Sequence, residues 1–278
     1  MRKKVLVIVG SRVLNYRKEL YAGLGELHDV TLIAEESIDV PGCNVVLAKV
    51  YQIGPFKFQP AVIYTYLSGS YEKVIVVANF AFIFNLILLL FGGRDKVISW
   101  GFWPTRGKIS NIVRSMIIKR GVKQIFYSDS HYKFYKKLHG DSLNGFVATN
   151  TVYVDQSLVS RYISNVRNNL IFVGGLNKRK GLDLLLEKLT PLLHRHPDMK
   201  FFIFGIGPEL KMLKNICNVN QISDQVTFLG YSDDPDNLAK YYSMSICEIS
   251  SNQAGLSILR SFGHGVPFLT LDNAISGG

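Results

Sequence analysis

The sequence predicts an α/β protein built from two doubly wound parallel sheets, each covered by helices on both faces. Short apolar runs alternate with longer helical patterns along nearly all of the 278 residues, and this alternation is typical of successive βαβ units. A polar, irregular stretch at residues 151–169 interrupts the alternation, which then resumes. We therefore expect two domains, 1–165 and 166–278, with a cleft between them.

In the first domain, strands and helices alternate at regular spacing. The expected strands are KVLVIVG (4–10), DVTLIA (29–34), KVIVVA (73–78), KVISW (96–100), QIFYS (124–128) and FVATN (146–150). The expected helices cover residues 16–27, 80–91, 108–120 and 130–138. Because the strands are apolar along most of their length, both faces of the sheet should be covered.

An uncharged run of 18 residues, from Val74 to Phe91, has nearly the length of a membrane-spanning helix. Asn79 and Asn85 interrupt it, and its composition changes from β-branched residues to Leu, Ile and Phe. We expect a buried strand, then Asn79 as a cap, then a packed helix from Phe80 to Phe91. A membrane span is the alternative.

The second domain repeats the alternation. The expected strands are LIFVGG (170–175), KFFIFG (200–205), QVTFLG (225–230), ICEIS (246–250) and PFLTL (267–271). The expected helices cover 181–194, 208–217 and 235–242, and a last helix begins at Gly255. The sequence stops just after a strand, at Ser276-Gly277-Gly278. We expect the second domain to be incomplete and the chain to be C-terminally truncated.

The net charge of +11 is concentrated in the first domain. Residues 1–165 carry 21 Lys and Arg against 11 Asp and Glu, whereas residues 166–278 carry 11 against 10. Such a field attracts nucleotide phosphates, acidic lipid surfaces or nucleic acid. No nucleic-acid-reading motif accompanies the basic residues, so we expect no nucleic-acid partner.

The three cysteines have no metal or redox spacing and are typical of a protein in a reducing compartment. No secretory signal is visible in the sequence.

Four loops follow strands of the second domain, and ligands of doubly wound sheets bind beyond the carboxyl ends of strands. The loops contain Lys178-Arg179-Lys180 before Gly181, Gly205 with Gly207, Gly230, and Gly255-Leu256-Ser257. Backbone N–H groups at a helix start favour an anion, and a neighbouring lysine neutralises phosphate charge. Taken alone, each loop is also compatible with a solvated basic turn or a tight strand–helix turn.

The last helix has a polar and an apolar set of residues at helical spacing. The polar set is Ser257, Arg260 and His264, and the apolar set is Leu256, Leu259 and Gly263. A polar stripe is usually a solvated face, so we expect the apolar set to face the sheet.

The order of the four loops resembles the C-terminal donor domain of family 4 glycosyltransferases, retaining enzymes of the GT-B fold. The matching stretches are VGGLNKRKGLDLLLEKL (173–189) for the family's G-R-L-x-x-x-K-G-x-x-x-L-L, FGIGPELKML (204–213) for G-x-G-P, VTFLGY (226–231) for V-x-F-x-G, and SNQAGLSILRSFGHGVPFLT (251–270) for E-G-F-G-L-x-x-x-E-A-x-A-x-G-x-P-V. The first domain matches more loosely, through VLNYRKELYAGL (13–24) and FVATNTVYVD (146–155).

The resemblance implies a site for a nucleotide-diphosphate sugar. Lys180 would bind the donor diphosphate and act in catalysis, and the helix start at Gly255, Leu256 and Ser257 would cradle the phosphates. The glycine loops at Gly205, Gly207 and Gly230 would line the nucleotide. No metal and no cofactor are implied.

Several family positions are changed in this chain. The family's Arg in G-R-L falls on Gly175, so Arg179 or Lys178 would have to supply that phosphate contact. A His–Gly pair of the first domain falls on Phe102-Trp103. Two signature glutamates fall on Asn252 and Arg260. Asn252 is expected to hydrogen-bond a sugar hydroxyl during catalysis, and Arg260 to bind phosphate or a base carbonyl.

The sequence therefore predicts a GT-B-like glycosyltransferase that transfers a sugar, with retention, to a glycan or lipid-linked acceptor. We expect it to act in surface polysaccharide or glycolipid synthesis, as a cytoplasmic protein held peripherally at an anionic membrane surface. A catalytically weak nucleotide-sugar-binding subunit of the same fold is the first alternative, and a nucleic-acid-binding protein is the second.

Overall fold

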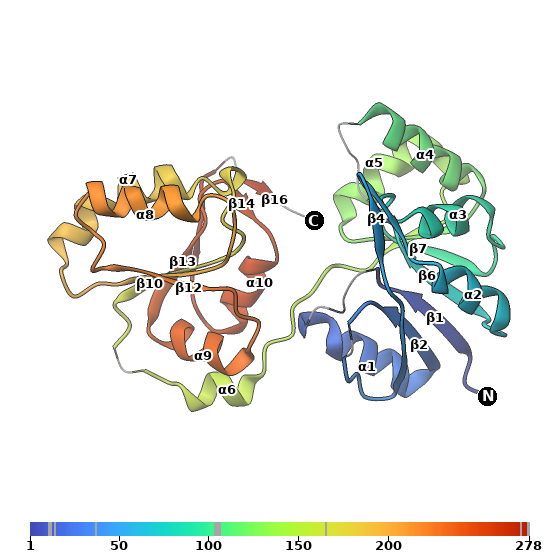
Figure 1. Cartoon of the computed structure of the whole chain (residues 1–278), viewed down its shortest axis with the longest axis horizontal. Helices are drawn as coiled ribbons and strands as arrows, with labels where there is room; N and C mark the ends of the chain where they lie inside the picture. Colours follow the sequence, from blue (N-terminus) through green and yellow to red (C-terminus); the bar gives the residue numbers. More distant parts are fainter. Residues whose placement is uncertain are drawn as a thin grey trace. The chain divides into compact units, whose positions relative to one another are not determined.

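The computed structural model describes residues 1–278 except 11–12, 14, 37, 103–106, 165, 273 and 277–278. The chain divides into two compact units, Met1–Asn150 and Thr151–Gly278 (Figure 1). The boundary expected at 165/166 differs from this division, which places residues 151–164 in the second unit. Each unit contains a parallel sheet with helices on its faces.

The first unit follows the expected βα order, with three additions. Its elements are β1 (Lys4–Ile8), α1 (Lys18–Leu27), β2 (Asp29–Ala34), β3 (Cys43–Leu47), β4 (Tyr51–Ile53), β5 (Phe56–Phe58), α2 (Ala61–Ser68), β6 (Lys73–Val77), α3 (Ile83–Phe91), β7 (Val97–Phe102), α4 (Lys108–Lys119), β8 (Lys123–Phe126), α5 (Asp129–His139) and β9 (Gly145–Val147), with 3-10 turns at Asn15–Arg17 and Gly140–Ser142. The sheet order is β3-β2-β1-β6-β7-β8-β9, and every neighbouring pair is parallel. The strand β3, the antiparallel β4–β5 hairpin and α2 were not expected.

Alternate residues of β1 enter two different cores, as a doubly wound sheet requires. Leu6 and Ile8 pack in the core that α2, α3, α4 and α5 cover. Val5 and Val7 pack on the other face, with Tyr21 of α1. All four side chains are buried, so both faces of β1 are covered.

The long uncharged run forms a strand and a packed helix, as predicted. β6 ends at Val77 and α3 begins at Ile83, so the helix starts three residues later than expected. The Asn79 side chain accepts a hydrogen bond from the Ala81 N–H at 3.1 Å; it stabilises the turn before the helix and is not its cap. Within the described ranges, no helix is long and apolar enough to cross a membrane.

The second unit has the expected strand–helix order. Its elements are α6 (Gln156–Arg161), β10 (Asn169–Val173), the 3-10 turn Lys178–Lys180, α7 (Leu182–Arg195), β11 (Phe201–Phe204), α8 (Leu210–Val219), β12 (Val226–Gly230), α9 (Pro235–Ser243), β13 (Ser245–Ile249), β14 (Gln253–Ala254), α10 (Leu256–Gly263), β15 (Phe268–Leu269) and β16 (Ile275–Ser276). The main sheet has the order β12-β11-β10-β13-β15 with parallel neighbours, and β14 pairs with β16. Figure 1 shows α7 and α8 on one face of this sheet and α9 on the other.

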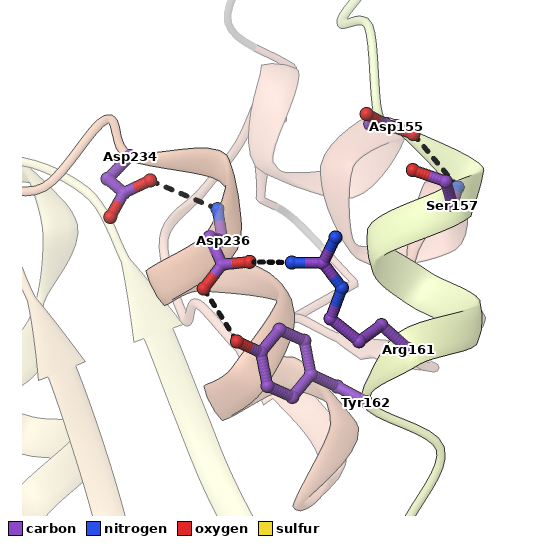
Figure 2. A network of polar contacts seen from close by, with 6 residues as sticks. All are labelled: Asp155, Ser157, Arg161, Tyr162, Asp234 and Asp236. Atoms are coloured by element: carbon purple, nitrogen blue, oxygen red, sulfur yellow. Dashed lines mark hydrogen bonds and ion pairs between the residues drawn. The ribbon is translucent and has the colours of Figure 1, made fainter.

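The polar stretch before β10 is not a plain linker, because it contains α6. The Asp155 side chain accepts from the Ser157 N–H at 2.8 Å and caps this helix. Arg161 donates to one carboxylate oxygen of Asp236 at 3.0 Å, and the Tyr162 hydroxyl donates to the other at 2.6 Å (Figure 2). Asp236 lies in the first turn of α9. These bonds join α6 to α9, so α6 packs with the second unit.

Candidate functional site

The four loops identified in the sequence begin at the carboxyl ends of neighbouring parallel strands. Backbone hydrogen bonds join three of them: the Gly174 N–H donates to Phe204 O at 2.9 Å, and the Gly205 N–H donates to Gly230 O at 2.7 Å. The strand order brings the fourth loop, after β13, beside the loop after β10. Gly230 ends β12, three strands away from β13.

Two glycines permit close contact between the loops after β10 and β11. A Cβ atom on Gly205 would overlap the carbonyl oxygen of Gly174, and a Cβ on Gly207 would overlap that of Leu176. At this close approach, the Leu176 N–H of one loop donates a hydrogen bond to Ile206 O of the other at 2.9 Å. The two loops therefore form one backbone layer that only glycine at these positions allows.

Gly207→Ala is expected to destabilise the second unit by roughly 1–3 kcal/mol, since the new methyl group must push two backbone segments apart. Urea unfolding measures the effect. The control is Gly23→Ala in α1, where an added Cβ would meet no atom within 4 Å; there the change should stabilise by about 0.5–1 kcal/mol. Equal effects at the two positions would contradict this account of the loop.

Lys180 differs from its two cationic neighbours in its burial. Lys178 and Arg179 are exposed, whereas Lys180 is half-buried. Its Cε lies 3.5 Å from the place where a Cβ of Gly174 would stand, so the side chain folds over the end of β10. Burial and the Arg179 charge lower the pKa of Lys180, and the Glu248 charge opposes this. The ammonium group thus lies in a low-dielectric site above the sheet.

Asn252 lies directly against the turn that carries Lys180. The Ser251 hydroxyl donates to the carbonyl oxygens of Lys180 at 3.0 Å and Gly181 at 3.1 Å. A Cβ on Gly181, which has a φ of 64°, would overlap the Asn252 amide. The structure therefore brings together the two residues predicted to act in catalysis, although about seventy residues separate them in the sequence.

The helix α10 begins where predicted, but its polar stripe faces inward. Ser257 and His264 are buried, whereas Leu259 is 41% exposed. The His264 ring stacks on Tyr242 with centroids 4.4 Å apart. The expectation of a solvated polar face is therefore wrong, and so is the placement of Leu259 against the sheet. Polar contacts hold the inward face instead: Ser261, also buried, donates to Val266 O at 2.9 Å.

The start of α10 lies in the loop that also carries Asn252. Gly255 occupies the cap position, without a capping side chain among the described residues, and Leu256 is the first helical residue. The first N–H groups of a helix have no partners within the helix and attract anions. Arg260 lies one turn further along α10, and its charge acts on both Glu248 and His264.

Glu248, which the sequence reasoning did not identify, lies between these cations. It is fully buried on β13 and accepts a hydrogen bond from the Tyr242 hydroxyl at 2.6 Å. Its Oε1 has no partner in the described part of the chain. Burial raises the pKa of Glu248 to about 8, against the opposing effects of the Tyr242 hydrogen bond, Arg260 and Lys180. A single carboxylate within an apolar strand was the signal that could have revealed it.

The comparison with protein families covers this part of the chain. Residues 161–275 match the family model of glycosyl transferases group 1. The group 1 match contains Lys180, Glu248, Asn252 and Arg260, and every strand of the main sheet of the second unit. The pair Phe102-Trp103 lies outside this match, and neither its side chains nor the following loop are among the described parts of the structure.

Several curated relatives of this chain are glycosyltransferases. The O-antigen biosynthesis glycosyltransferase WclY of Escherichia coli is 23% identical over 146 residues, which cover 51% of this chain and 40% of WclY. An uncharacterized glycosyltransferase of Haemophilus influenzae is 31% identical over 106 residues, which cover 37% and 29% of the two chains. The chain thus spans well under half the length of these relatives.

Solved structures align with residues of both units. WaaG, a glycosyltransferase involved in lipopolysaccharide biosynthesis, aligns with a TM-score of 0.63 at 13% identity. The alignment covers 97% of this chain and 81% of the WaaG chain. Anabaena HepE, solved with UDP and glucose, aligns with a TM-score of 0.70 at 12% identity. The alignment covers 99% of this chain and 82% of the HepE chain. The predicted α/β class, with Rossmann-like parallel sheets as in GT-B glycosyltransferases, is confirmed.

Proposed function

We propose that the chain is a glycosyltransferase that takes its sugar from a nucleotide-diphosphate donor bound at the carboxyl edge of the second sheet. One observation carries the proposal: Ser251 ties the Asn252 loop to the backbone of Lys180 and Gly181, within the stretch that matches the group 1 family. The UDP and glucose bound to HepE support a nucleotide-sugar donor.

The arrangement suits cleavage of a sugar–phosphate bond. Negative charge builds on the leaving diphosphate as this bond breaks, so a fixed cation stabilises the transition state more than the ground state. Lys180 and the N–H groups at the start of α10 supply that positive charge, and Arg260 adds a fork for phosphate or a base carbonyl. The Asn252 amide orients a sugar hydroxyl. In this mechanism no metal is needed, and transfer proceeds with retention, as in family 4.

The acceptor we propose is a glycan or a lipid-linked sugar in surface polysaccharide or glycolipid synthesis. The names of WclY and WaaG support this class of product.

We also propose a peripheral position on an anionic membrane. The basic first unit supports it, and so does the β4–β5 hairpin, where exposed Ile53 and Phe56 lie near Lys49 and Lys57 in the sequence. Three free cysteines suit the cytoplasmic side. Sedimentation with anionic lipid vesicles tests the membrane part.

A screen of UDP-, GDP-, ADP- and CMP-sugars tests the donor part. We expect one class to raise the melting temperature and to be turned over in the presence of EDTA. Arg260→Ala should lower donor binding, and Asn252→Ala should mainly lower turnover. Binding without turnover would indicate a nucleotide-sugar-binding subunit. Wild-type rates in both variants at limiting donor would contradict the roles of these residues, and loss of activity in EDTA would contradict the metal-independent mechanism.

A further inference from the structure

In the first unit, a guanidinium group lies among aromatic rings at the carboxyl edge of the sheet. Arg17 immediately precedes α1, and its Cζ lies 5.2 Å from the centroid of the Trp100 ring and 5.5 Å from that of Tyr127. Its Nη2 donates to the Tyr127 hydroxyl at 3.1 Å and to Asn150 Oδ1 at 3.4 Å. Tyr21 meets Trp100 edge to face at 6.1 Å.

This half-buried cation has no carboxylate partner. No ion pair in the described structure includes Arg17, and none of the residues outside the described ranges is Asp or Glu, so none of them can supply one. Removing a charge from water without a counter-charge is costly. Aromatic faces offset only part of this cost, roughly 0.5–2 kcal/mol for each well-placed ring.

The buried polar groups around Arg17 are also donors without acceptors. The Trp100 side chain is 8% exposed and Tyr21 is fully buried. Neither the Trp100 Nε1 nor the Tyr21 hydroxyl donates a hydrogen bond to a described residue, and the Arg17 Nε does not donate one either. Burial raises the pKa of Tyr21 to about 12, although the Arg17 charge opposes this. The phenol therefore keeps its proton near neutral pH, and indole can only donate.

The cluster lies where a doubly wound sheet binds ligands. Trp100 is near the end of β7, Tyr127 follows β8, and Arg17 lies in the connection after β1. In the sheet, β1 lies between β2 and β6, where the strand order reverses. The crevice beyond the carboxyl ends at such a point is the usual ligand site.

We propose that the first unit binds an oxyanion at Arg17, with Tyr21 and Trp100 as additional donors, and that this oxyanion is the phosphate or carboxylate group of the acceptor. Its assignment to the acceptor rests on the proposed transferase function, whereas the oxyanion site itself does not. An oxyanion supplies the missing counter-charge and accepts the unused hydrogen bonds, and a planar guanidinium binds it through two nitrogens.

Fluorescence of the full chain tests the proposal directly, because the two tryptophans of the sequence are Trp100 and Trp103. Methyl phosphate and glucuronate are each titrated at constant ionic strength, with chloride as the reference and no nucleotide present. We expect a saturable change in tryptophan emission for at least one of the two, and which one responds identifies the group. A response to neither anion, or the same response to chloride, overturns the proposal.

The decisive variant is Tyr21→Phe, which removes a hydroxyl that donates to no residue of the described structure and should change the melting temperature little. It should weaken oxyanion binding roughly fivefold, the effect of one hydrogen bond. Arg17→Lys keeps the charge but loses the fork and should weaken binding by about tenfold. Arg94→Gln removes an exposed charge of the same unit and should change nothing. Wild-type affinity in both Tyr21→Phe and Arg17→Lys overturns the proposal.

The proposed oxyanion site of the first unit and the proposed nucleotide site of the second unit can be tested independently. Lys180→Ala should leave the tryptophan response to the oxyanion unchanged while it weakens nucleotide binding, and Tyr21→Phe should do the opposite. Loss of the oxyanion response in Lys180→Ala would place the binding at the second unit and overturn the inference.

Discussion

Lys180→Ala is expected to weaken binding of the nucleotide-diphosphate sugar by roughly 1.5–3 kcal/mol, the effect of a charge-assisted hydrogen bond, or about 10- to 150-fold in Kd. The side chain folds over Gly174 at the end of β10, and its half-buried position strengthens the attraction to a phosphate. Isothermal titration with the donor found in the screen measures the loss. Turnover should fall further, because charge on the leaving group grows in the transition state.

The control for this experiment is Lys188→Ala. Lys188 is an exposed lysine on α7 of the same unit, so the variant removes an equal charge outside the loop. Its donor affinity should stay within twofold of wild type. Unchanged affinity in Lys180→Ala would remove this residue from the site, and equal losses in the two variants would show only a long-range effect of net charge.

Glu248→Gln is expected to remove a large part of the pH dependence of stability. The pKa of Glu248 is raised to about 8, whereas an unfolded glutamate titrates near 4.3. The folded state therefore holds a proton that the unfolded state releases between these two values. The stabilisation is fully present below about pH 4.3 and is lost as the pH rises through 8. At about 1.4 kcal/mol for each pKa unit, the wild type should lose several kcal/mol that the variant keeps.

Urea unfolding at pH 5 and pH 9 checks this prediction. The matched control is Glu187→Gln on the exposed face of α7, which should retain the slope of the wild type. Donor affinity provides a second measurement: ionised Glu248 opposes the charges of Lys180 and Arg260, so the wild type should lose more affinity above pH 8 than Glu248→Gln. Parallel stability curves for wild type and Glu248→Gln would mean that the carboxyl group is already ionised near neutral pH.

The sequence predicted the parts of the fold that depend on the alternation of strands and helices. It also predicted which loops meet at one edge, because parallel strands point their carboxyl ends the same way. The packing of the Asn252 loop on the Lys180 turn follows from β10 and β13 being neighbours. The short helix α6 was missed because its residues are polar and its stability comes from contacts with Asp236, which are distant in sequence.

Other features depended on side-chain environments that local patterns do not encode. The periodicity of α10 separates two faces correctly, but it does not say which one is buried. The stacking of His264 on Tyr242 decides that. Glu248 was missed for a similar reason. A charged residue within an apolar strand is unusual, but its protonation and its contacts depend on Tyr242, Arg260 and Lys180, which the local sequence does not place beside it.

The contact between Gly181 and Asn252 has a consequence for engineering the proposed donor site. Any side chain at position 181 would occupy the volume of the Asn252 amide, and the positive φ of Gly181 disfavours most replacements in any case. Substitutions at these two positions are therefore coupled, and effects measured one at a time will not add. A library that varies position 252 toward smaller residues together with position 181 explores combinations that single-site scanning misses. Asn252 therefore restricts the tolerated sequence of the Lys180 turn, in addition to the role proposed for it toward the sugar.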